Sequence, residues 1–274
     1  MISCKEYVTI KKKELKEKIK TFDREPVLAV VQIDNDPASC SYVRGKKKDC
    51  EEVGIKCVHI PIDSNKYSQK ELEQLLTDLS ENKTVDGIIL QLPIPKKKYN
   101  VEVLQNCICS YKDVDGFRKD SCFKPCTPKG IIDWLKYNDF DFVGKDVVVL
   151  GRSKIVGKPL VNMLIDEGAT VTCCNSHSYT PKYTSYADLV ISAIGKPKYF
   201  ETSNFRNVDI IVDVGINRDE DGKLCGDINT EHFAECLPFT YITPVPGGVG
   251  LLTRETLLEN TVKAYELNRM EDKK

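Results

Sequence analysis

The chain has 274 residues, a length that predicts two domains or one large one. Hydrophobic residues make up 41% of it and charged residues 30%, which is typical of a globular protein with an ordinary polar surface. Because 40 basic residues are balanced by 41 acidic ones, the formal net charge is -1, which argues against binding to nucleic acid through overall charge.

Other composition features narrow the class of protein further. The sequence has neither the apolar run of about 18 residues that a membrane span needs nor the apolar centre of a signal peptide, so we expect a cytoplasmic protein. Its 12 cysteines lack the repeated C-x-x-C spacing of a zinc site, and we expect them to be reduced thiols. With 3 histidines, a histidine base or a multi-histidine metal site is a poor prediction, and we expect no metal.

The first half of the chain alternates between strand-like and helix-like patterns. Apolar runs predict strands over residues 27–33, 55–62 and 87–90. Residues 68–80 carry leucines at the i, i+3, i+4 and i+7 spacing of an amphipathic helix. Such alternation predicts an α/β fold with parallel sheets.

Four side chains in this half are candidates for chemistry. Tyr42 and Lys46 lie four residues apart in a helix that we expect to begin near residue 39, so they share a face that suits a planar ligand and proton transfer; a surface Tyr–Lys pair is the alternative. Gln91 ends a buried strand, where ligands bind in open α/β sheets. Asp113 and Asp115 lie in one turn, and at most one of them need be functional.

The second half repeats the alternation. A helix is predicted from about residue 127 and a last helix over 253–267. The predicted strands cover 147–150, 170–174, 189–193 and 210–214. The sequence therefore predicts two α/β domains, with a boundary between 118 and 124.

Residues 147–159 have the pattern of a strand, a glycine-bearing loop and the start of a helix, a geometry that aims backbone N–H groups at a phosphate. The loop departs from the G-x-G-x-x-G fingerprint, since Ser153 replaces the middle glycine and the last is displaced to Gly157; a structural turn is the alternative. The following strand ends without the acid that binds the ribose of NAD, and Arg152 with Ser176 suits a 2′-phosphate, which favours NADP.

Six motifs in this order resemble those of the bifunctional methylenetetrahydrofolate dehydrogenase/cyclohydrolase family. They are Tyr42-x-x-x-Lys46, Gln91-Leu-Pro-Ile-Pro95, Asp113-Val-Asp-Gly116, Pro125-Cys-Thr-Pro-Lys-Gly130, Gly151-Arg-Ser-Lys-Ile-Val-Gly157 with Pro159, and Pro246-Gly-Gly-Val-Gly250 before Thr253. The resemblance implies oxidation of 5,10-methylenetetrahydrofolate with NADP+, NAD being possible. Hydrolysis of the methenyl product to 10-formyltetrahydrofolate would follow, as part of one-carbon metabolism and purine biosynthesis.

The resemblance also implies roles for individual residues. Lys46 would transfer the proton of the cyclohydrolase step, Gln91 would orient Lys46, Tyr42 would stack on the aminobenzoate ring and Asp115 would bind the pterin. The implied folate-binding residues are Tyr42, Lys46, Gln91, Pro93, Asp115, Pro246, Gly247 and Gly248. The implied cofactor-binding residues are Gly151, Arg152, Ser153, Ile155, Val156, Gly157, Pro159, Ser176, Gly195 and Ile216.

The implied architecture is a folate-binding catalytic domain of residues 1–122 and 252–274 and a Rossmann-like NAD(P)-binding domain of residues 123–251. The C-terminal helix returns to the first domain, and the members are commonly homodimers. The sequence departs from the family pattern at Asp120-Ser121-Cys122, Asn175 and Leu251.

Three alternatives remain at this point: a monofunctional NAD(P)-dependent methylenetetrahydrofolate dehydrogenase, another two-domain dehydrogenase, and a folate- or nucleotide-binding regulatory module. The lysine runs 46–48 and 96–98 flank the expected folate site, and we expect one or both to attract a polyglutamate tail; a solvated surface is the alternative.

Overall fold

The computed structural model describes residues 1–271, and the chain divides into two units, each with its own sheet and core. The first unit joins Ile10–Cys126 with the chain from Arg254 onward, and the second unit joins Met1–Thr9 with Thr127–Thr253. In the described part of the chain, none of the helices combines the length and apolar character needed to cross a lipid bilayer.

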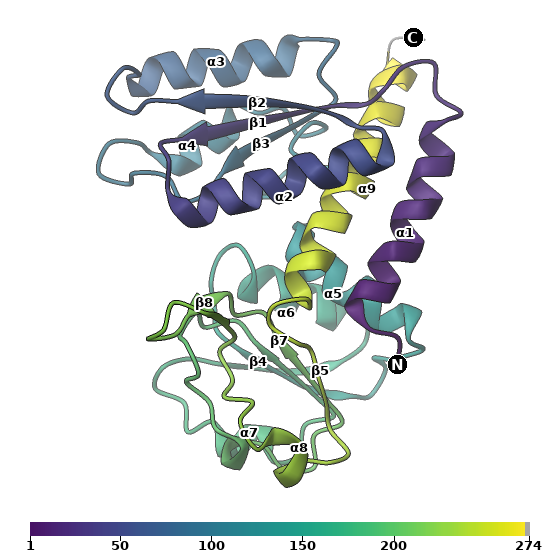
Figure 1. Cartoon of the computed structure of the whole chain (residues 1–274), viewed down its shortest axis with the longest axis vertical. Coiled ribbons are helices and arrows are strands. Elements are labelled where there is room, and N and C mark those ends of the chain that lie inside the picture. Colours follow the sequence, from purple (N-terminus) through teal and green to yellow (C-terminus); the bar gives the residue numbers. More distant parts are fainter. Residues whose placement is uncertain (272–274) are drawn as a thin grey trace. The chain divides into compact units, whose positions relative to one another are not determined.

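The first unit contains a parallel sheet in the order β2-β1-β3 (Figure 1). Its elements are α1 (Cys4–Ile19, shared with the second unit), β1 (Val27–Ile33), α2 (Pro37–Val53), β2 (Lys56–Ile62), α3 (Gln69–Glu81), β3 (Gly87–Gln91), α4 (Val101–Asn106) and α9 (Val249–Glu271, shared). The three strands predicted from apolar runs are confirmed to within a residue at each end. The predicted helix over 68–80 is α3, whose N-terminus is fixed by a capping box between Ser68 and Glu71.

Both faces of β1 and β3 are buried, which is why these two strands are almost continuously apolar, whereas the edge strand β2 is largely half-buried. Alternate residues of β1 point to opposite cores: Leu28 and Val30 pack with α1, α2 and α9, whereas Ala29 and Val31 pack with α3 and α4. Figure 1 shows α2 and α3 on opposite faces. Full burial of each such leucine or valine contributes roughly 1.5–3 kcal/mol.

The second unit contains a parallel sheet in the order β10-β7-β6-β4-β5 and a separate antiparallel pair, β8-β9. Its elements are α5 (Cys126–Tyr137), β4 (Asp146–Leu150), α6 (Gly157–Asp166), β5 (Thr170–Cys174), α7 (Pro181–Thr184), β6 (Leu189–Ser192), η1 (Thr202–Asn204), β7 (Ile210–Asp213), β8 (Asn217–Arg218), β9 (Leu224–Cys225), α8 (Phe233–Cys236) and β10 (Tyr241–Ile242). Val147 and Val149 of β4 face a core with α5 and α6, and Val148 faces a second core containing Phe200 and Phe205.

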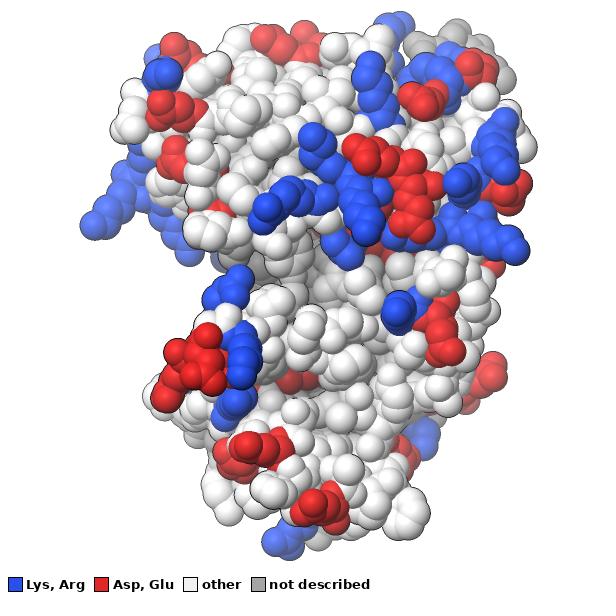
Figure 2. All heavy atoms as spheres, in the orientation of Figure 1, with Lys and Arg blue, Asp and Glu red and all other residues white. Residues whose placement is uncertain are grey.

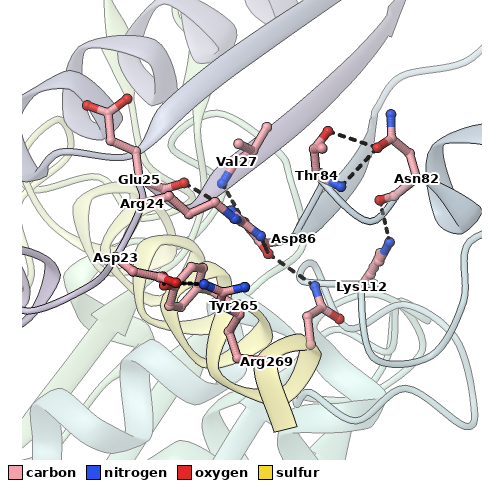
Figure 3. A network of polar contacts seen from close by, with 11 residues as sticks. Asp23, Arg24, Glu25, Val27, Asn82, Thr84, Asp86, Lys112, Tyr265 and Arg269 are labelled. Atoms are coloured by element: carbon pink, nitrogen blue, oxygen red, sulfur yellow. Dashed lines mark hydrogen bonds and ion pairs between the residues drawn. The ribbon is translucent and has the colours of Figure 1, made fainter. Parts of the chain in front are cut away.

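The predicted return of the C-terminal helix is confirmed, because α9 from Arg254 onward packs within the first unit. Figure 3 shows part of the polar network that holds it. The fully buried Asp86 carboxylate accepts two hydrogen bonds from the Arg24 guanidinium, at 2.7 and 2.8 Å, and one from the backbone N–H of Val27 at 2.8 Å. The side-chain amide of Asn268 on α9 donates to the same carboxylate at 3.2 Å.

The N-terminal residues group differently from the predicted domains. The expected folate-binding domain includes residues 1–9, whereas Cys4, Tyr7 and Val8 pack in the core of the second unit around Trp134. Trp134 Nε1 donates to the carbonyl of Ile2 at 3.2 Å. The short N-terminal segment thus crosses from one unit to the other within α1, a feature that an amphipathic pattern does not indicate.

Candidate functional site

In the first unit, Lys46 and Gln91 meet at the carboxyl end of β3. Lys46 Nζ donates to Gln91 Oε1 at 2.9 Å, and Gln91 Nε2 donates to the carbonyl of Leu92 at 2.7 Å. The exposed fractions are 6% for Lys46 and 9% for Gln91. An amine is therefore held inside the unit by a neutral amide, whose own orientation is fixed by the backbone.

The start of α2 places Tyr42 and Lys46 on one face. The Asp36 side chain caps the helix by accepting from the backbone N–H of Ser39 at 2.8 Å, and Pro37 occupies the first turn, where its missing N–H costs nothing. Tyr42 is half-buried one turn before Lys46. Burial raises the pKa of the Tyr42 phenol and the positive charge of Arg254 opposes that rise, so the ring is present as a neutral phenol.

Side chains from α1 and α9 fix the same face of α2 one turn further on. The buried Asp49 carboxylate lies 2.6 Å from Lys12 Nζ and 3.0 Å from Arg254 Nε. A side chain at Gly45 would overlap the Arg254 guanidinium, so glycine permits this close approach. This cluster could not be predicted from the sequence, because residues from three separate helices build it. Figure 2 shows the wider setting, with basic and acidic side chains interspersed over α1 and α2.

The structure gives the two carboxylates of the Asp113–Asp115 turn different surroundings. Asp113 is 4% exposed and accepts from the backbone N–H of Arg118 at 2.9 Å. Burial raises its pKa, the Arg118 N–H opposes the rise and the neighbouring Asp115 charge adds to it. Gly116 has a φ of 72° and a Cβ there would lie 2.6 Å from the Lys124 backbone, so the turn requires glycine. Asp113 therefore builds the turn, whereas the Asp115 side chain is half-buried and more accessible.

The remaining predicted folate-binding residues lie in proline loops. Pro93 is exposed after a cis bond from Leu92 in the first unit. Pro246, Gly247 and Gly248 belong to the second unit, in the loop between β10 and α9. Gly247 has a φ of 104°, a value that favours glycine.

In the second unit, the loop from Gly151 to Gly157 follows the carboxyl end of β4 and is packed backbone against backbone. Gly151 has a φ of 113°, and a Cβ there would lie 2.9 Å from the carbonyl carbon of Ala193, in the segment after β6. A Cβ at Gly157 would lie 2.8 Å from the carbonyl carbon of Gly151. Both positions therefore need glycine, as a loop that approaches a phosphate closely does.

Ser153, at the position of the middle glycine of the usual fingerprint, uses its side chain within the loop. Its Oγ accepts from the backbone N–H of Val156 at 3.1 Å and of Gly157 at 3.3 Å, and so it caps the first turn of α6. The backbone N–H of Lys158 donates to the Ser153 carbonyl at 3.0 Å, and Pro159 has no N–H, so what the start of α6 offers an anion is the positive end of its dipole.

The ten predicted cofactor-binding residues all lie in loops or a helix start after the carboxyl ends of β4, β5, β6 and β7. β4 has β5 on one side and β6 on the other, so the chain reverses its strand order here, which is where dinucleotides bind in such sheets. Arg152 is exposed and close enough to Cys173, near the end of β5, that its charge opposes the burial that raises the Cys173 pKa. These residues fit a dinucleotide with a 2′-phosphate.

Two buried carboxylates in this unit, Asp213 and Asp227, hold the loops after β6 and β7 and are not among the predicted site residues. The one available signal is that Asp213 directly ends an apolar strand. Among residues 1–271, His, Cys, Asp and Glu side chains form no group of three or more suited to a metal ion.

Two family models match the chain. The tetrahydrofolate dehydrogenase/cyclohydrolase catalytic domain matches residues 2–115, and the NAD(P)-binding domain of the same description matches residues 125–269. The bifunctional protein FolD of Agathobacter rectalis is 42% identical over 268 residues, which cover 93% of this chain and 95% of that protein.

Solved structures agree with these matches. The bifunctional enzyme FolD, methylenetetrahydrofolate dehydrogenase/cyclohydrolase, of Campylobacter jejuni superposes with a TM-score of 0.91 at 40% identity, covering 97% of this chain and 98% of that one. The Trypanosoma brucei enzyme, solved with NADP cofactor and an inhibitor, has a TM-score of 0.88 at 27% identity and covers 97% of each chain. The family predicted from six motifs is confirmed: the chain belongs to the tetrahydrofolate dehydrogenase/cyclohydrolase family.

Proposed function

We propose that the protein oxidises 5,10-methylenetetrahydrofolate to 5,10-methenyltetrahydrofolate with NADP+ and hydrolyses the product to 10-formyltetrahydrofolate. The observation that carries this proposal is the buried hydrogen bond between Lys46 and Gln91. Hydrolysis needs a group that moves protons at a fixed place, and a buried amine held by an amide supplies one. The first unit then binds folate and the second unit binds NADP+.

The dehydrogenase step needs orientation more than a reactive side chain. NADP+, when bound, accepts the hydride that leaves the methylene carbon as the folate nitrogen lone pair forms the cation. The loop from Gly151 to Gly157 and the positive end of the α6 dipole would hold the pyrophosphate, and Arg152 with Ser176 would bind the 2′-phosphate. The other proposed cofactor contacts are Ser153, Ile155, Val156, Pro159, Gly195 and Ile216.

The cyclohydrolase step adds water to the methenyl carbon. The water loses both protons as the formyl C=O bond forms and the bond from the carbon to N5 breaks; one proton ends on N5 and the other is released. Lys46 Nζ carries protons between these atoms, and Gln91 keeps it in place. Tyr42 stacks on the aminobenzoate ring and Asp115 accepts from the pterin N–H groups, with Pro93 of the same unit as a further folate contact.

A paired assay tests both activities. With 5,10-methylenetetrahydrofolate and either NADP+ or NAD+, reduced cofactor is read directly and surviving methenyl product in an unquenched sample. We expect cofactor reduction with little surviving methenyl product, and we expect Lys46→Ala to let it accumulate. Accumulation in the wild-type protein would indicate the monofunctional dehydrogenase instead. Folate binding without cofactor reduction would indicate a regulatory module.

We further propose that the lysines beside the folate site attract a polyglutamate tail. Lys46 points inward, so the tail would meet Lys47, Lys48 and the exposed run Lys96–Lys98. The attraction weakens with salt because surface charges are screened. Equal KM values for monoglutamate and pentaglutamate substrates at low ionic strength would contradict this.

The family resemblance also supports a homodimer joined through the second units, in the cytoplasm. Tyr179, Tyr186 and Phe239 of that unit expose 74%, 83% and 97% of their surface and offer apolar area for such a contact. Light scattering after size-exclusion chromatography measures the mass and would reveal a monomer.

A further inference from the structure

We propose that Asp227 is a positioning residue for the dehydrogenase reaction: its buried carboxylate fixes the loops after β6 and β7 and so shapes the NADP+ site. The proposal rests on the proposed function of the second unit and names the side chain that holds two cofactor-binding segments together.

Four donors surround the Asp227 carboxylate, which is fully buried. Oδ2 accepts from Ser192 Oγ at 3.0 Å and from the backbone N–H of Ile194 at 2.7 Å. Oδ1 accepts from the backbone N–H of Lys196 and from Asn217 Nδ2, both at 3.0 Å. A carboxylate has about four lone-pair sites, so this one is fully used.

These donors lie next to two predicted cofactor-binding residues in the chain. Gly195 lies between the two backbone N–H groups that Asp227 holds, and Ile216 precedes Asn217. The segment after β6 also begins with Ala193, whose carbonyl packs against Gly151 in the loop from Gly151 to Gly157. Asp227 therefore holds one segment that contacts the loop after β4 and a second that follows β7.

Asp213 fixes Asp227 in turn. Asp213 Oδ1 accepts from the backbone N–H groups of Asp227 and Gly215, both at 2.9 Å, and Oδ2 accepts from Ile228 at 3.0 Å. A Cβ at Gly215 would lie 2.5 Å from the Asp227 nitrogen, and a Cβ at Gly226 would be equally close to the Asp213 carboxyl carbon. Two glycines thus let the carboxylates approach the backbone that they organise.

A carboxylate is required because every group around it is a donor. In Asp227→Asn one carboxylate oxygen becomes an NH2 group, which then faces two donors. If it replaces Oδ1, the Asn217 amide can flip to accept, but the backbone N–H of Lys196 loses its acceptor. If it replaces Oδ2, the backbone N–H of Ile194 loses its acceptor. A hydrogen bond to a charged group contributes enough for us to expect a rise of about tenfold in the Kd for NADP+.

The experiment compares Asp227→Asn with the control variant Asp188→Asn, whose carboxylate lies at the amino ends of the strands, opposite the cofactor site. Asp188 accepts from Lys145 Nζ at 2.9 Å and from the backbone N–H of Asp146 at 2.8 Å, at the amino end of β4. Calorimetry measures the Kd for NADP+, thermal unfolding without cofactor measures stability, and steady-state kinetics separate KM from kcat. Hydrolysis of supplied 5,10-methenyltetrahydrofolate, with no NADP+ present, measures the cyclohydrolase.

We expect Asp227→Asn to raise the Kd and KM for NADP+ about tenfold, with a smaller loss of kcat and unchanged cyclohydrolase activity. We expect Asp188→Asn to lower thermal stability without changing the Kd. Asn217→Ala removes a single donor and provides a milder variant should Asp227→Asn not fold; its Kd should rise about threefold.

The proposal is overturned if folded Asp227→Asn, or Asn217→Ala in its place, binds NADP+ as the wild-type protein does. It is equally overturned if Asp188→Asn raises the Kd as much, or if dehydrogenase and cyclohydrolase fall together, since both would indicate general destabilisation. Wild-type protein that binds NADP+ but does not reduce it would contradict the proposed function alone. The role of Asp227 would still be tested by the ratio of the calorimetric Kd values for NADP+ of Asp227→Asn and the wild-type protein.

Discussion

Glycines in the second unit show how one residue type serves two different purposes. Gly144 and Gly151 both have a positive φ, 74° and 113°. A Cβ at Gly144 would meet nothing within 4 Å, whereas a Cβ at Gly151 would overlap the Ala193 carbonyl. Conformation alone thus selects glycine at 144, and close backbone contact adds a second requirement at 151.

This difference predicts unequal effects of the same substitution. Gly144→Ala should lower the free energy of unfolding by about 1–2 kcal/mol, the cost of a left-handed backbone. Gly151→Ala should lower it by about 3 kcal/mol or more, because overpacking against backbone adds to that cost. Urea unfolding followed by Trp134 fluorescence measures both, since this unit contains the protein's 1 tryptophan.

NADP+ binding separates the two variants further. Gly151→Ala should weaken binding because the loop must move away from the segment after β6, and Gly144→Ala should leave it unchanged. Equal NADP+ affinities for two folded variants would show that the Gly151 loop does not form the cofactor site.

The helix face of Lys46 could be predicted from the sequence, but its burial and its hydrogen-bond partner could not. The run Lys46-Lys47-Lys48 has the composition of a solvated surface, yet Lys46 is buried and Lys48 is exposed. The i, i+4 spacing with Tyr42 correctly placed the two residues on one helix face. Its partner Gln91 is 45 residues away in the chain, so nothing local in the sequence indicates their hydrogen bond.

At the scale of elements, long periodic segments were predictable and short ones were not. The strands of both sheets, except the two-residue β10, and helices α3, α5 and α6 follow their apolar patterns closely. The elements β8, β9, α7 and α8 have two to four residues each, too few to show a period. The first turn of α9 was also missed, because it begins at Val249 inside a glycine-rich stretch that predicts a loop.

The docking of α9 depends on a buried charge, which gives a prediction at this scale. Asp86→Ala should lower the free energy of unfolding of the first unit by about 3–5 kcal/mol, since it leaves the Arg24 guanidinium without its buried partner. A half-exposed ion pair between Lys18 and Glu266, at 2.8 Å, also joins α1 to α9. Lys18→Ala removes this pair and should lower the free energy of unfolding by less than about 1 kcal/mol.

Hydrogen exchange of the α9 amides measures both effects locally. Exchange should speed up strongly in Asp86→Ala and only slightly in Lys18→Ala. The same exchange rates in both variants would mean that apolar packing of Leu257, Leu258 and Val262 holds α9 without the buried network.

For the whole molecule, the alternation of elements was enough to predict two α/β domains, and the return of the last helix came from the family resemblance. The packing of the N-terminal residues in the core of the second unit could not be reached in this way, because Cys4, Tyr7 and Val8 form an apolar stripe that fits either core. The Asp213–Asp227 cluster was equally out of reach. Its donors come from residues 192 to 217, and only the folded sheet brings these loops together.

That cluster makes the stability of the second unit depend on pH. Burial, opposed by backbone N–H groups and reinforced by the Asp227 charge, raises the pKa of Asp213 to about 6. The unfolded chain has a pKa near 3.9, so between these values the folded state holds the proton more tightly. The stabilisation by this proton is complete below pH 4 and is lost as the pH rises through 6, by about 3 kcal/mol in all.

Asp213→Asn removes the titrating group, so the difference in unfolding free energy between wild type and variant isolates it. We expect the wild type to lose about 3 kcal/mol relative to Asp213→Asn between pH 4 and pH 7, with most of the change between pH 4 and 6. Urea unfolding followed by Trp134 fluorescence measures the two curves in the same unit. A difference that stays constant over this range, or that grows in favour of the wild type as the pH rises, would mean that the backbone N–H groups around Asp213 outweigh its burial.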